Sequence, residues 1–270
     1  MLKSKSLLKL LFVSMLAVLV LAACGKSEEK ETANGLEAIK KEEKIVFGVK
    51  NDTRLFGLKN PSSGEIEGFD IDIAKEIAKE IVGDEKNIEF KEVTSKTRVP
   101  MLQNGQIDAI IATMTITEER KKEVDFSDVY FEAGQSLLVK KGSDIKSIDD
   151  IKKGTKVLAV KGSTSTKNIR EKSPDAEVLE YENYTEAFTA LKSGQGDALT
   201  TDNAILYGMA AEDSSYEVVG EPFTDEPYGI AVKKGNEDLV KEINAVLEEL
   251  KSSGKYDEIY KKWIKEDLSN

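Results

Sequence analysis

Three short stretches of this chain recur later in the sequence in the same order. The clearest pair has the pattern Leu-x-x-Gly-Gln-x-Asp-Ala and spans residues 102–109 and 191–198. A helix that ends at glycine and is followed by a buried strand fits this pattern. The repeated order predicts two similar lobes with a cleft between them, where ligand groups lie at the carboxyl ends of strands. The other two pairs are residues 46–50 with 157–161 and residues 139–142 with 232–235.

Alternating apolar strands and amphipathic helices follow one another from Lys44 onward. Residues 70–81 place five apolar side chains on one helical face, and Gly83 is positioned to end that helix. The alternation indicates an α/β fold with largely parallel central strands. Further strands are expected at 45–49, 88–93, 107–112, 157–160 and 198–201, and further helices at 97–104, 165–172, 183–191, 203–211 and 236–267.

The chain is expected to cross between the two lobes twice. The first crossing is placed near residues 130–134 and the return near residues 224–228, where two Glu-Pro pairs interrupt regular structure. Two crossing strands form a hinge that permits rigid-body closure over a ligand. The first lobe then comprises residues 44–132 and 227–270, and the second lobe comprises residues 133–226.

The first 24 residues have the features of an export signal. Three lysines precede an apolar run from Leu10 to Ala23, which is too short to be a dependable membrane span. The run ends in Leu-Ala-Ala followed by Cys24, the pattern that lipoprotein signal peptidase cuts before the cysteine. We therefore predict a signal peptide at residues 1–23 and an extracytoplasmic protein anchored to the cell membrane by a lipid on Cys24. An ordinary secretory signal with an incidental cysteine is the alternative.

The segment after the cysteine is highly charged and almost free of large apolar residues. Such a composition predicts a flexible tether at residues 24–43 that holds the body of the protein away from the membrane.

Composition excludes several classes of function. The chain has no histidine, and Cys24 is its only cysteine. This excludes Ser-His-Asp and Cys-His catalysis and the usual zinc sites, and no cofactor is expected. Removal of residues 1–23 takes away three lysines and changes the formal net charge from −11 to −14. So acidic a body argues against nucleic acid as a partner.

Threonines and an arginine follow the strand that ends near Ala112. Thr113, Thr115 and Thr117 alternate along the chain, and Arg120 follows one helical turn later. An arginine can hold a carboxylate through two parallel hydrogen bonds. The alternative is that Thr117 only caps a helix and that Arg120 is a surface cation.

The second half offers complementary groups at two strand ends. Asp202 could face the threonines across the cleft and receive an ammonium group, or it could only cap the helix that begins near Asn203. The stretch Gly-Ser-Thr-Ser-Thr at residues 162–166 includes Thr164 and Ser165. Its backbone N–H groups at a helix start suit a carboxylate, although simple capping is again the alternative.

Two further cations could place positive charge at the rim of the cleft. Lys50 lies at the end of the first strand, and Arg98 lies in the segment 94–100 that starts a helix. The alternative is that both are ordinary solvated cations.

Four stretches of the sequence resemble the polar-amino-acid family of solute-binding proteins that serve ABC importers. They are residues 68–74, 108–120, 125–128 and 228–231, and the resemblance extends over residues 44–265. It implies a two-lobed, type II periplasmic-binding-protein-like fold with the ligand in the interlobe cleft. It also implies a non-enzymatic monomer that delivers a free polar amino acid to an ABC transporter permease in the membrane. Because a few proteins with this fold are dehydratases acting on small acids, an enzyme is a less favoured alternative.

The resemblance also implies roles for individual residues. Arg120 would hold the α-carboxylate of the ligand, together with Thr115 and the backbone near Ser165. Asp202 and the backbone of Thr113 would receive the α-amino group. The side-chain end of the ligand would meet Lys50, Ser95 and Arg98.

The side-chain end of the site departs from the glutamine-binding members of that family. Those proteins hold the ligand between aromatic residues and meet its amide with an acidic residue, whereas this chain has Thr53, Ser95 and Lys50 at these positions. Because Lys50 and Arg98 complement a second carboxylate, glutamate or aspartate is the first expectation for the ligand. Glutamine is the alternative.

Overall fold

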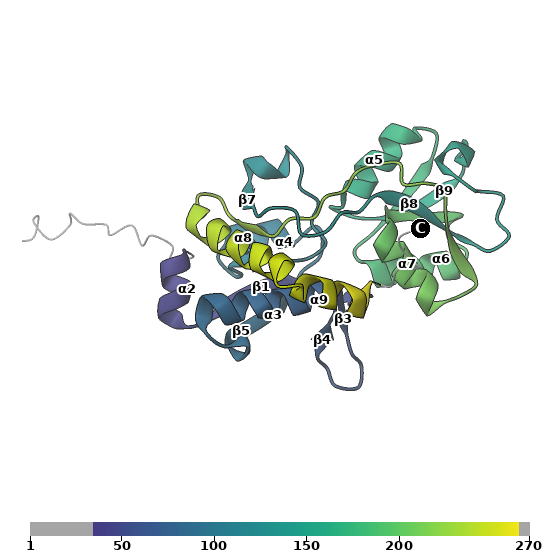
Figure 1. The fold of residues 1–270 in the computed structure, drawn as a ribbon. Coiled ribbons are helices and arrows are strands. Elements are labelled where there is room, and N and C mark those ends of the chain that lie inside the picture. Colours follow the sequence, from purple (N-terminus) through teal and green to yellow (C-terminus); the bar gives the residue numbers. More distant parts are fainter. Residues whose placement is uncertain (1–34, 265–270) are drawn as a thin grey trace, which may run out of the picture. The chain divides into compact units, whose positions relative to one another are not determined.

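The computed structural model describes residues 35–264, which form two five-stranded sheets covered by helices (Figure 1). The first sheet has the strand order β5-β1-β6-β13-β7. β1 pairs in parallel with β5 and β6, and β13 runs antiparallel between β6 and β7. These strands are β1 (Ile45–Val49), β5 (Ile88–Glu92), β6 (Ala109–Ile110), β7 (Val124–Phe126) and β13 (Ala231–Lys233).

Helices cover both faces of the first sheet, and together they make up the first lobe. The long helices α8 and α9, drawn in yellow, lie beside α3 in Figure 1 and pack against it. A separate apolar cluster that includes Leu102 of α4 fills the other face. The helices are α3 (Phe69–Val82), α4 (Arg98–Gln103), α8 (Glu237–Ser252) and α9 (Lys255–Trp263), with short turns η1 (Glu85–Asn87) and η2 (Arg120–Lys122). A small sheet consists of β2 (Asp52–Thr53), β3 (Gly57–Lys59) and β4 (Ile66–Glu67).

The second sheet repeats the arrangement of the first and forms the second lobe. Its order is β10-β9-β11-β8-β12, with β9 parallel to β10 and β11, and β8 antiparallel to β11 and β12. Its strands are β8 (Gln135–Lys140), β9 (Lys156–Val160), β10 (Glu177–Tyr181), β11 (Ala198–Asp202) and β12 (Tyr216–Val219). Its helices are α5 (Thr164–Lys172), α6 (Tyr184–Lys192) and α7 (Asn203–Glu212), with the turn η3 (Ile148–Asp150).

The Leu-x-x-Gly-Gln-x-Asp-Ala stretches have the same local structure in both lobes. In each, the glycine has a positive φ, 69° at Gly105 and 76° at Gly194. In the first lobe, Asp108 Oδ2 accepts the backbone N–H of Val46 at 2.8 Å. In the second lobe, Asp197 Oδ2 accepts the backbone N–H of Lys156 at 2.8 Å. The repeat therefore contains an aspartate that ties the start of one parallel strand to its neighbour.

Two antiparallel segments connect the lobes. We call residues 130–134 the outgoing strand and residues 224–228 the return strand. The backbone N–H of Glu226 donates to the carbonyl of Ala133 at 2.7 Å, and that of Tyr228 donates to the carbonyl of Phe131 at 2.8 Å. The two crossings expected from the sequence thus lie side by side.

Aromatic rings anchor both connecting strands to the first lobe. The rings of Phe131 and Tyr228 stack with their centroids 5.5 Å apart. Phe131 also contacts Phe69 of α3 at 5.6 Å and Tyr260 of α9 at 6.0 Å. These rings belong to the large core cluster, in which edge-to-face and stacked pairs add to the stability gained from burial.

Helix α2 (Leu36–Glu42) lies within the range that was expected to be a flexible tether, and for residues 36–42 that prediction is wrong. Ile39 is buried in the core, and Lys40 Nζ pairs with Glu242 Oε1 of α8 at 2.8 Å. Leu36 and Ile39 are one helical turn apart, and this small apolar face is enough to dock the helix. The expected signal peptide and Cys24 lie outside the described residues. Within those residues, no helix has the length and apolar character needed to cross a membrane.

Candidate functional site

The residues nominated from the sequence lie where the two lobes face each other. A hollow of about 770 Å³ is lined by both lobes. Five of the nine nominated residues line it, namely Ser95, Arg98, Thr115, Arg120 and Thr164. The other four, Lys50, Thr113, Ser165 and Asp202, are buried.

Four buried side-chain atoms in the described part of the chain have no hydrogen-bond partner, and all four belong to nominated residues. They are Arg98 Nε, Thr113 Oγ1, Ser165 Oγ and Asp202 Oδ1. Buried polar atoms in folded proteins nearly always have partners, so such a concentration in one place points to a ligand site. The set combines an anionic acceptor, a cationic donor and two hydroxyls, which matches the ammonium and carboxylate groups of an amino acid.

Asp202 ends β11 and is 4% exposed. It occupies the N-cap position of α7, but its side chain makes no capping hydrogen bond, so the capping interpretation is wrong. Instead Tyr228 Oη donates to Asp202 Oδ2 at 2.5 Å. Burial, with a smaller contribution from the nearby Glu226 carboxylate, raises the pKa of Asp202 to about 7. A buried carboxylate with a free oxygen is a suitable receptor for an ammonium group.

Arg120 connects the two lobes. Its Nη1 donates to the carbonyl of Thr115 at 2.7 Å, and its Nη2 donates to the carbonyl of Gly162 in the second lobe at 3.2 Å. Burial lowers the pKa of Arg120, and the Glu226 and Asp202 carboxylates partly oppose this shift. The surface-cation interpretation of Arg120 is therefore wrong. Thr117 Oγ1 accepts the backbone N–H of Arg120 at 3.1 Å, although Glu119 occupies the N-cap position of η2.

The hydroxyls of Thr115 and Thr164 share one acceptor. Each donates to Glu226 Oε2 at 2.7 Å. A hydroxyl that gives its only proton to a carboxylate can offer a ligand nothing but lone pairs. The Thr115 hydroxyl therefore suits an ammonium group, which differs from its expected place beside the α-carboxylate. Thr164 contacts Glu226 and Gln135, whose Nε2 donates to Thr164 Oγ1 at 3.0 Å.

Lys50 and Arg98 are buried rather than solvated at the rim of the cleft, with exposures of 1% and 2%. Lys50 Nζ donates to Ser95 Oγ at 3.1 Å and lies 5.0 Å from the ring centroid of Tyr184. Arg98 Nη1 donates to the carbonyl of Ala112 at 2.8 Å. Burial lowers the pKa of Lys50 to about 8 and that of Arg98 to about 9. Both cations thus have neighbours that already use part of their donor capacity.

Asp70 compensates part of this positive charge. It is fully buried at the start of α3 and accepts the backbone N–H of Thr113 at 3.0 Å and Tyr130 Oη at 2.9 Å. Burial raises the pKa of Asp70 to about 7, against the effect of these hydrogen bonds and of Arg98 and Lys50. The hydrogen bond from Thr113 also explains how that residue is held at a φ of 46°, which non-glycine residues rarely adopt.

Three cationic and three anionic side chains therefore influence one another at the site. The cations are Lys50, Arg98 and Arg120, and the anions are Asp70, Asp202 and Glu226. The partly buried Asp52 adds a further negative charge beside Lys50.

Sequence reasoning missed Asp70, Glu226 and Tyr228 as site residues. Asp70 had a usable signal, because it lies one helical turn before Ala74 and Ile73 on the apolar face of α3. Tyr228 lies in one of the stretches that resemble known solute-binding proteins. Glu226 sits between two prolines in a segment without periodicity, and no local pattern marks it.

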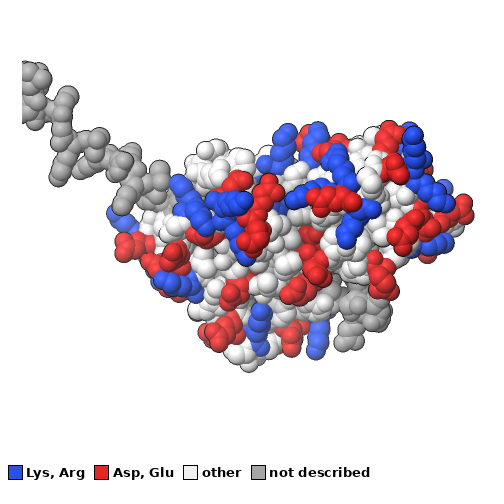
Figure 2. All heavy atoms as spheres, turned by 90° about the horizontal axis from the view of Figure 1, so that it is seen from above, with Lys and Arg blue, Asp and Glu red and all other residues white. Residues whose placement is uncertain are grey.

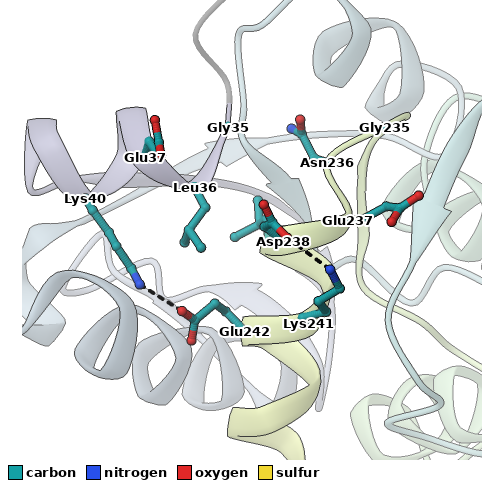
Figure 3. Close-up of a pocket in the computed structure, with 11 residues that line it drawn as sticks. Gly35, Leu36, Glu37, Lys40, Gly235, Asn236, Glu237, Asp238, Lys241 and Glu242 are labelled. Atoms are coloured by element: carbon teal, nitrogen blue, oxygen red, sulfur yellow. Dashed lines mark hydrogen bonds and ion pairs between the residues drawn. The ribbon is translucent and has the colours of Figure 1, made fainter.

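A larger hollow of about 850 Å³ lies away from these residues, between α2 and the start of α8 (Figure 3). Four of its charged side chains form two pairs: Lys40 with Glu242 at 2.8 Å, and Lys241 with Asp238 at 3.1 Å. Because none of the four unpartnered buried atoms lies there, the interlobe hollow is the better candidate for a ligand site.

Two other kinds of site find little support in residues 35–264. No group of three or more acidic or cysteine side chains within this range could hold a metal ion. On the face shown in Figure 2, Lys and Arg side chains lie among Asp and Glu side chains rather than forming one basic area.

Comparison with known proteins agrees with the geometry. Residues 45–266 match the family described as bacterial extracellular solute-binding proteins, family 3. A Bacillus subtilis protein named ABC transporter glutamine-binding protein GlnH is 73% identical, over 97% of this chain and 98% of its own length. A glutamine-binding protein of Geobacillus stearothermophilus is 59% identical, over 87% of this chain and 94% of its own.

Solved structures show the same fold. The structure of an ancestral arginine-binding protein bound to glutamine has 48% sequence identity and a TM-score of 0.78, and it covers 83% of this chain and 99% of its own. A structure of the solute receptor for L-cysteine of Neisseria gonorrhoeae has 34% identity and a TM-score of 0.80, with coverages of 85% and 93%. The fold thus agrees with that of amino-acid-binding proteins. The chain belongs to family 3 of the bacterial extracellular solute-binding proteins, as a two-lobed, non-enzymatic, extracytoplasmic protein that binds an amino acid for an ABC importer.

Proposed function

We propose that this chain binds glutamine between its two lobes and delivers it to the permease of an ABC importer in the membrane. The observation that carries the proposal is the 73% identity, over nearly the whole chain, to the glutamine-binding protein of Bacillus subtilis. Glutamine thereby replaces glutamate or aspartate as the preferred ligand.

The charges of the site support a ligand with a neutral side chain. Asp70, Asp202, Glu226 and Asp52 offset the three cations, and a zwitterion such as glutamine adds no net charge to the site. Glutamate would add a negative charge beside Lys50 and Arg98, whose charges Asp70 and Asp52 already offset in part, and excess charge in a buried site is costly. The argument from Lys50 and Arg98 to an acidic ligand did not include these carboxylates.

We assign the two ends of the ligand as follows. Asp202, the Thr113 carbonyl and the Thr115 hydroxyl receive the α-ammonium group. Arg120 and the N-terminal backbone of α5 at Ser165 bind the α-carboxylate, with Thr164 supporting them through Glu226. Lys50, Ser95 and Arg98 donate to the side-chain amide oxygen.

Ligand binding and lobe closure are coupled in this proposal. The ligand first contacts the first lobe, and groups such as Asp202 and Ser165 of the second lobe complete the site on closure. A ligand can shift the open–closed equilibrium only through the contacts it gains in the closed form.

Calorimetric titration of the protein, after unfolding, dialysis and refolding to remove carried-over amino acid, tests the ligand. Glutamine, glutamate, aspartate and arginine are compared under identical conditions. We expect glutamine to bind at least about tenfold more tightly than glutamate, a difference of about 1.4 kcal/mol. Tighter binding of glutamate would overturn the proposal and reinstate the interpretation based on Lys50 and Arg98.

We also propose that residues 1–23 are a signal peptide, that Cys24 carries the lipid anchor, and that the protein is a monomer. Metabolic labelling with a fatty acid in the native cell type should mark the parent protein and not a Cys24→Ser variant. Equal labelling of the two would exclude Cys24 as the anchor.

The lobe boundaries 44–132 with 227–270, and 133–226, are part of the same proposal. They are supported by the membership of the two sheets, since all strands from 135 to 219 belong to the second sheet.

A further inference from the structure

Glu226 is a buried carboxylate of the return strand, with an exposure of 2%. Its two oxygens accept four hydrogen bonds. Oε2 accepts the hydroxyls of Thr115 and Thr164, both at 2.7 Å. Oε1 accepts Nδ2 of Asn168 at 2.8 Å and the hydroxyl of Thr224 at 3.0 Å. The sequence analysis nominated Thr115 and Thr164 only as ligand-binding residues and did not predict that they hold the two lobes together.

The network joins the two lobes at a single side chain. Thr115 follows β6 in the first lobe, whereas Thr164 and Asn168 belong to α5 in the second lobe. Thr164 and Asn168 are one helical turn apart, so both can reach the same carboxylate. Separation of the lobes would therefore break the bonds to Glu226 on one side or the other.

The return strand contacts both side chains assigned to the α-ammonium group. Residues 226 and 228 are two positions apart in an extended segment, so their side chains project to the same side. Glu226 receives the Thr115 hydroxyl, and Tyr228 Oη donates to Asp202 at 2.5 Å. Because the Thr115 proton is committed to Glu226, the lone pairs of that hydroxyl remain for a ligand N–H.

We propose that Glu226 is a positioning residue for ligand binding. It fixes the Thr115 hydroxyl as an acceptor for the α-ammonium group, and it holds α5 of the second lobe against the first lobe when the ligand is bound. This inference rests on the cleft being the amino-acid site, but not on glutamine being the preferred amino acid.

The first test compares Glu226→Gln with Glu221→Gln. Both changes remove one negative charge from the same segment, but Glu221 is exposed and does not line the interlobe hollow. The amide nitrogen that Glu226→Gln introduces cannot accept a hydroxyl proton, so part of the network is lost. Calorimetry should show glutamine affinity at least tenfold weaker for Glu226→Gln and within threefold of the parent for Glu221→Gln. Equal affinities for the two variants would overturn the proposal.

A second test separates positioning from a merely structural role. Asn168→Asp places a second carboxylate at the position whose Nδ2 now lies 2.8 Å from Glu226 Oε1, and it should weaken glutamine binding at least tenfold by repulsion. In the double variant Glu226→Gln with Asn168→Asp, the new amide at position 226 can donate to the new carboxylate at position 168. The double variant should therefore bind more tightly than Asn168→Asp alone. Additive losses would show that residues 226 and 168 do not act through each other, and would overturn the interlobe bridge.

Failure of the Glu226 proposal can be distinguished from failure of the glutamine assignment. If the parent protein prefers glutamate or arginine, the ligand proposal fails, and the same variants are then compared with the parent using that ligand. The ratio between variant and parent for one ligand tests Glu226 alone.

Discussion

The two lobes share one plan and differ at the ends of their central strands. Both contain a helix, a glycine with positive φ and an aspartate that ties neighbouring strands together through Asp108 or Asp197. After β6, the first lobe continues into Thr113 and Thr115 and then Arg120. At the end of β11, the second lobe presents Asp202.

This difference shows how a duplicated scaffold can bind a zwitterion. The shared aspartates, glycines and strand order determine where the strands end, and they contact no ligand group in our assignment. The residues that follow the strands place hydroxyls and a cation on one side of the cleft and a carboxylate on the other. Around the α-ammonium group, the first lobe therefore supplies the Thr113 carbonyl and the Thr115 hydroxyl, and the second lobe supplies the Asp202 carboxylate.

The largest expected effect is at the carboxylate unique to the second lobe. Asp202→Asn removes the charge that receives the ammonium group, and glutamine affinity should fall at least about 100-fold, or about 2.7 kcal/mol. Calorimetry measures the loss, with Glu212→Gln at the exposed end of α7 as a control for charge. Binding within a few-fold of the parent would show that the two lobes do not divide the ligand as proposed.

The shared aspartates should differ in their contribution to stability. Asp108 is partly buried and Asp197 is exposed, although both accept a backbone N–H at 2.8 Å. Asp108→Ala should lower the free energy of unfolding by about 2 kcal/mol, and Asp197→Ala by less than about 1 kcal/mol. Urea unfolding of the two variants measures this directly. Equal losses would mean that burial does not distinguish the two copies of the motif.

The pH dependence of binding should follow Asp202. Its pKa is raised to about 7, so lowering the pH protonates the carboxylate that the ammonium group requires. Glutamine affinity should weaken about tenfold from pH 8 to pH 6, and binding near pH 7 should release protons. Titrations in buffers of different ionisation enthalpy detect this release. A pH-independent affinity would contradict the assignment. Asp202→Asn should remove the contribution of Asp202 to the profile and leave those of Asp70 and Lys50.

The folding stability of the ligand-free protein should change with pH in the opposite direction to the affinity. Because the folded-state pKa values of Asp70 and Asp202 lie above the ordinary value of 3.8, the folded state binds more protons than the unfolded state between these limits. Their contribution to stability is greatest below pH 4 and is lost as the pH rises through 7. Thermal unfolding of the ligand-free protein should therefore show that these two groups contribute more stability at pH 6 than at pH 8.

The smallest expected effect concerns the close approach of the second lobe to the first. Gly208 lies inside α7, and a Cβ there would be 3.0 Å from the carbonyl oxygen of Arg54 and 3.3 Å from its Cβ. Gly208→Ala should favour the helix by up to about 1 kcal/mol, yet weaken glutamine binding about threefold because closure is hindered. Calorimetry and melting of the ligand-free protein measure the two effects. Unchanged affinity would show that the lobes tolerate the methyl group.

Much of the scaffold was predictable because its signals are periodic and local. The apolar face of residues 70–81, the repeated motif and the glycines that follow helices all correspond to elements of the structure. The nominated Asp202 and Arg120 lie at the cleft for the same reason, since strand ends determine where they are placed. Helix α2 was missed because Leu36 and Ile39 are two apolar residues among many charges.

The electrostatics of the site could not be predicted in this way. Whether Lys50 and Arg98 favour an acidic ligand depends on Asp70, which is distant in sequence and contacts the strand end through Thr113. Glu226 is 111 residues from Thr115 and is linked to it only through the fold. Charge compensation of this kind is a property of the assembled structure and leaves no local pattern.

The aromatic packing around the connecting strands has a mechanical consequence. Phe131 contacts Phe69 and Tyr260 of the first lobe, and Tyr228 stacks on Phe131, so the connecting strands and the first lobe behave as one stationary body. In any swing, the second lobe must then pivot at residues beyond these rings. These are the few residues just before β8 on one connecting strand and just before Glu226 on the other. Such a swing would separate the Tyr228 phenol from Asp202 and would leave its ring environment unchanged. A spectroscopic label on that phenol would consequently report the angle between the lobes.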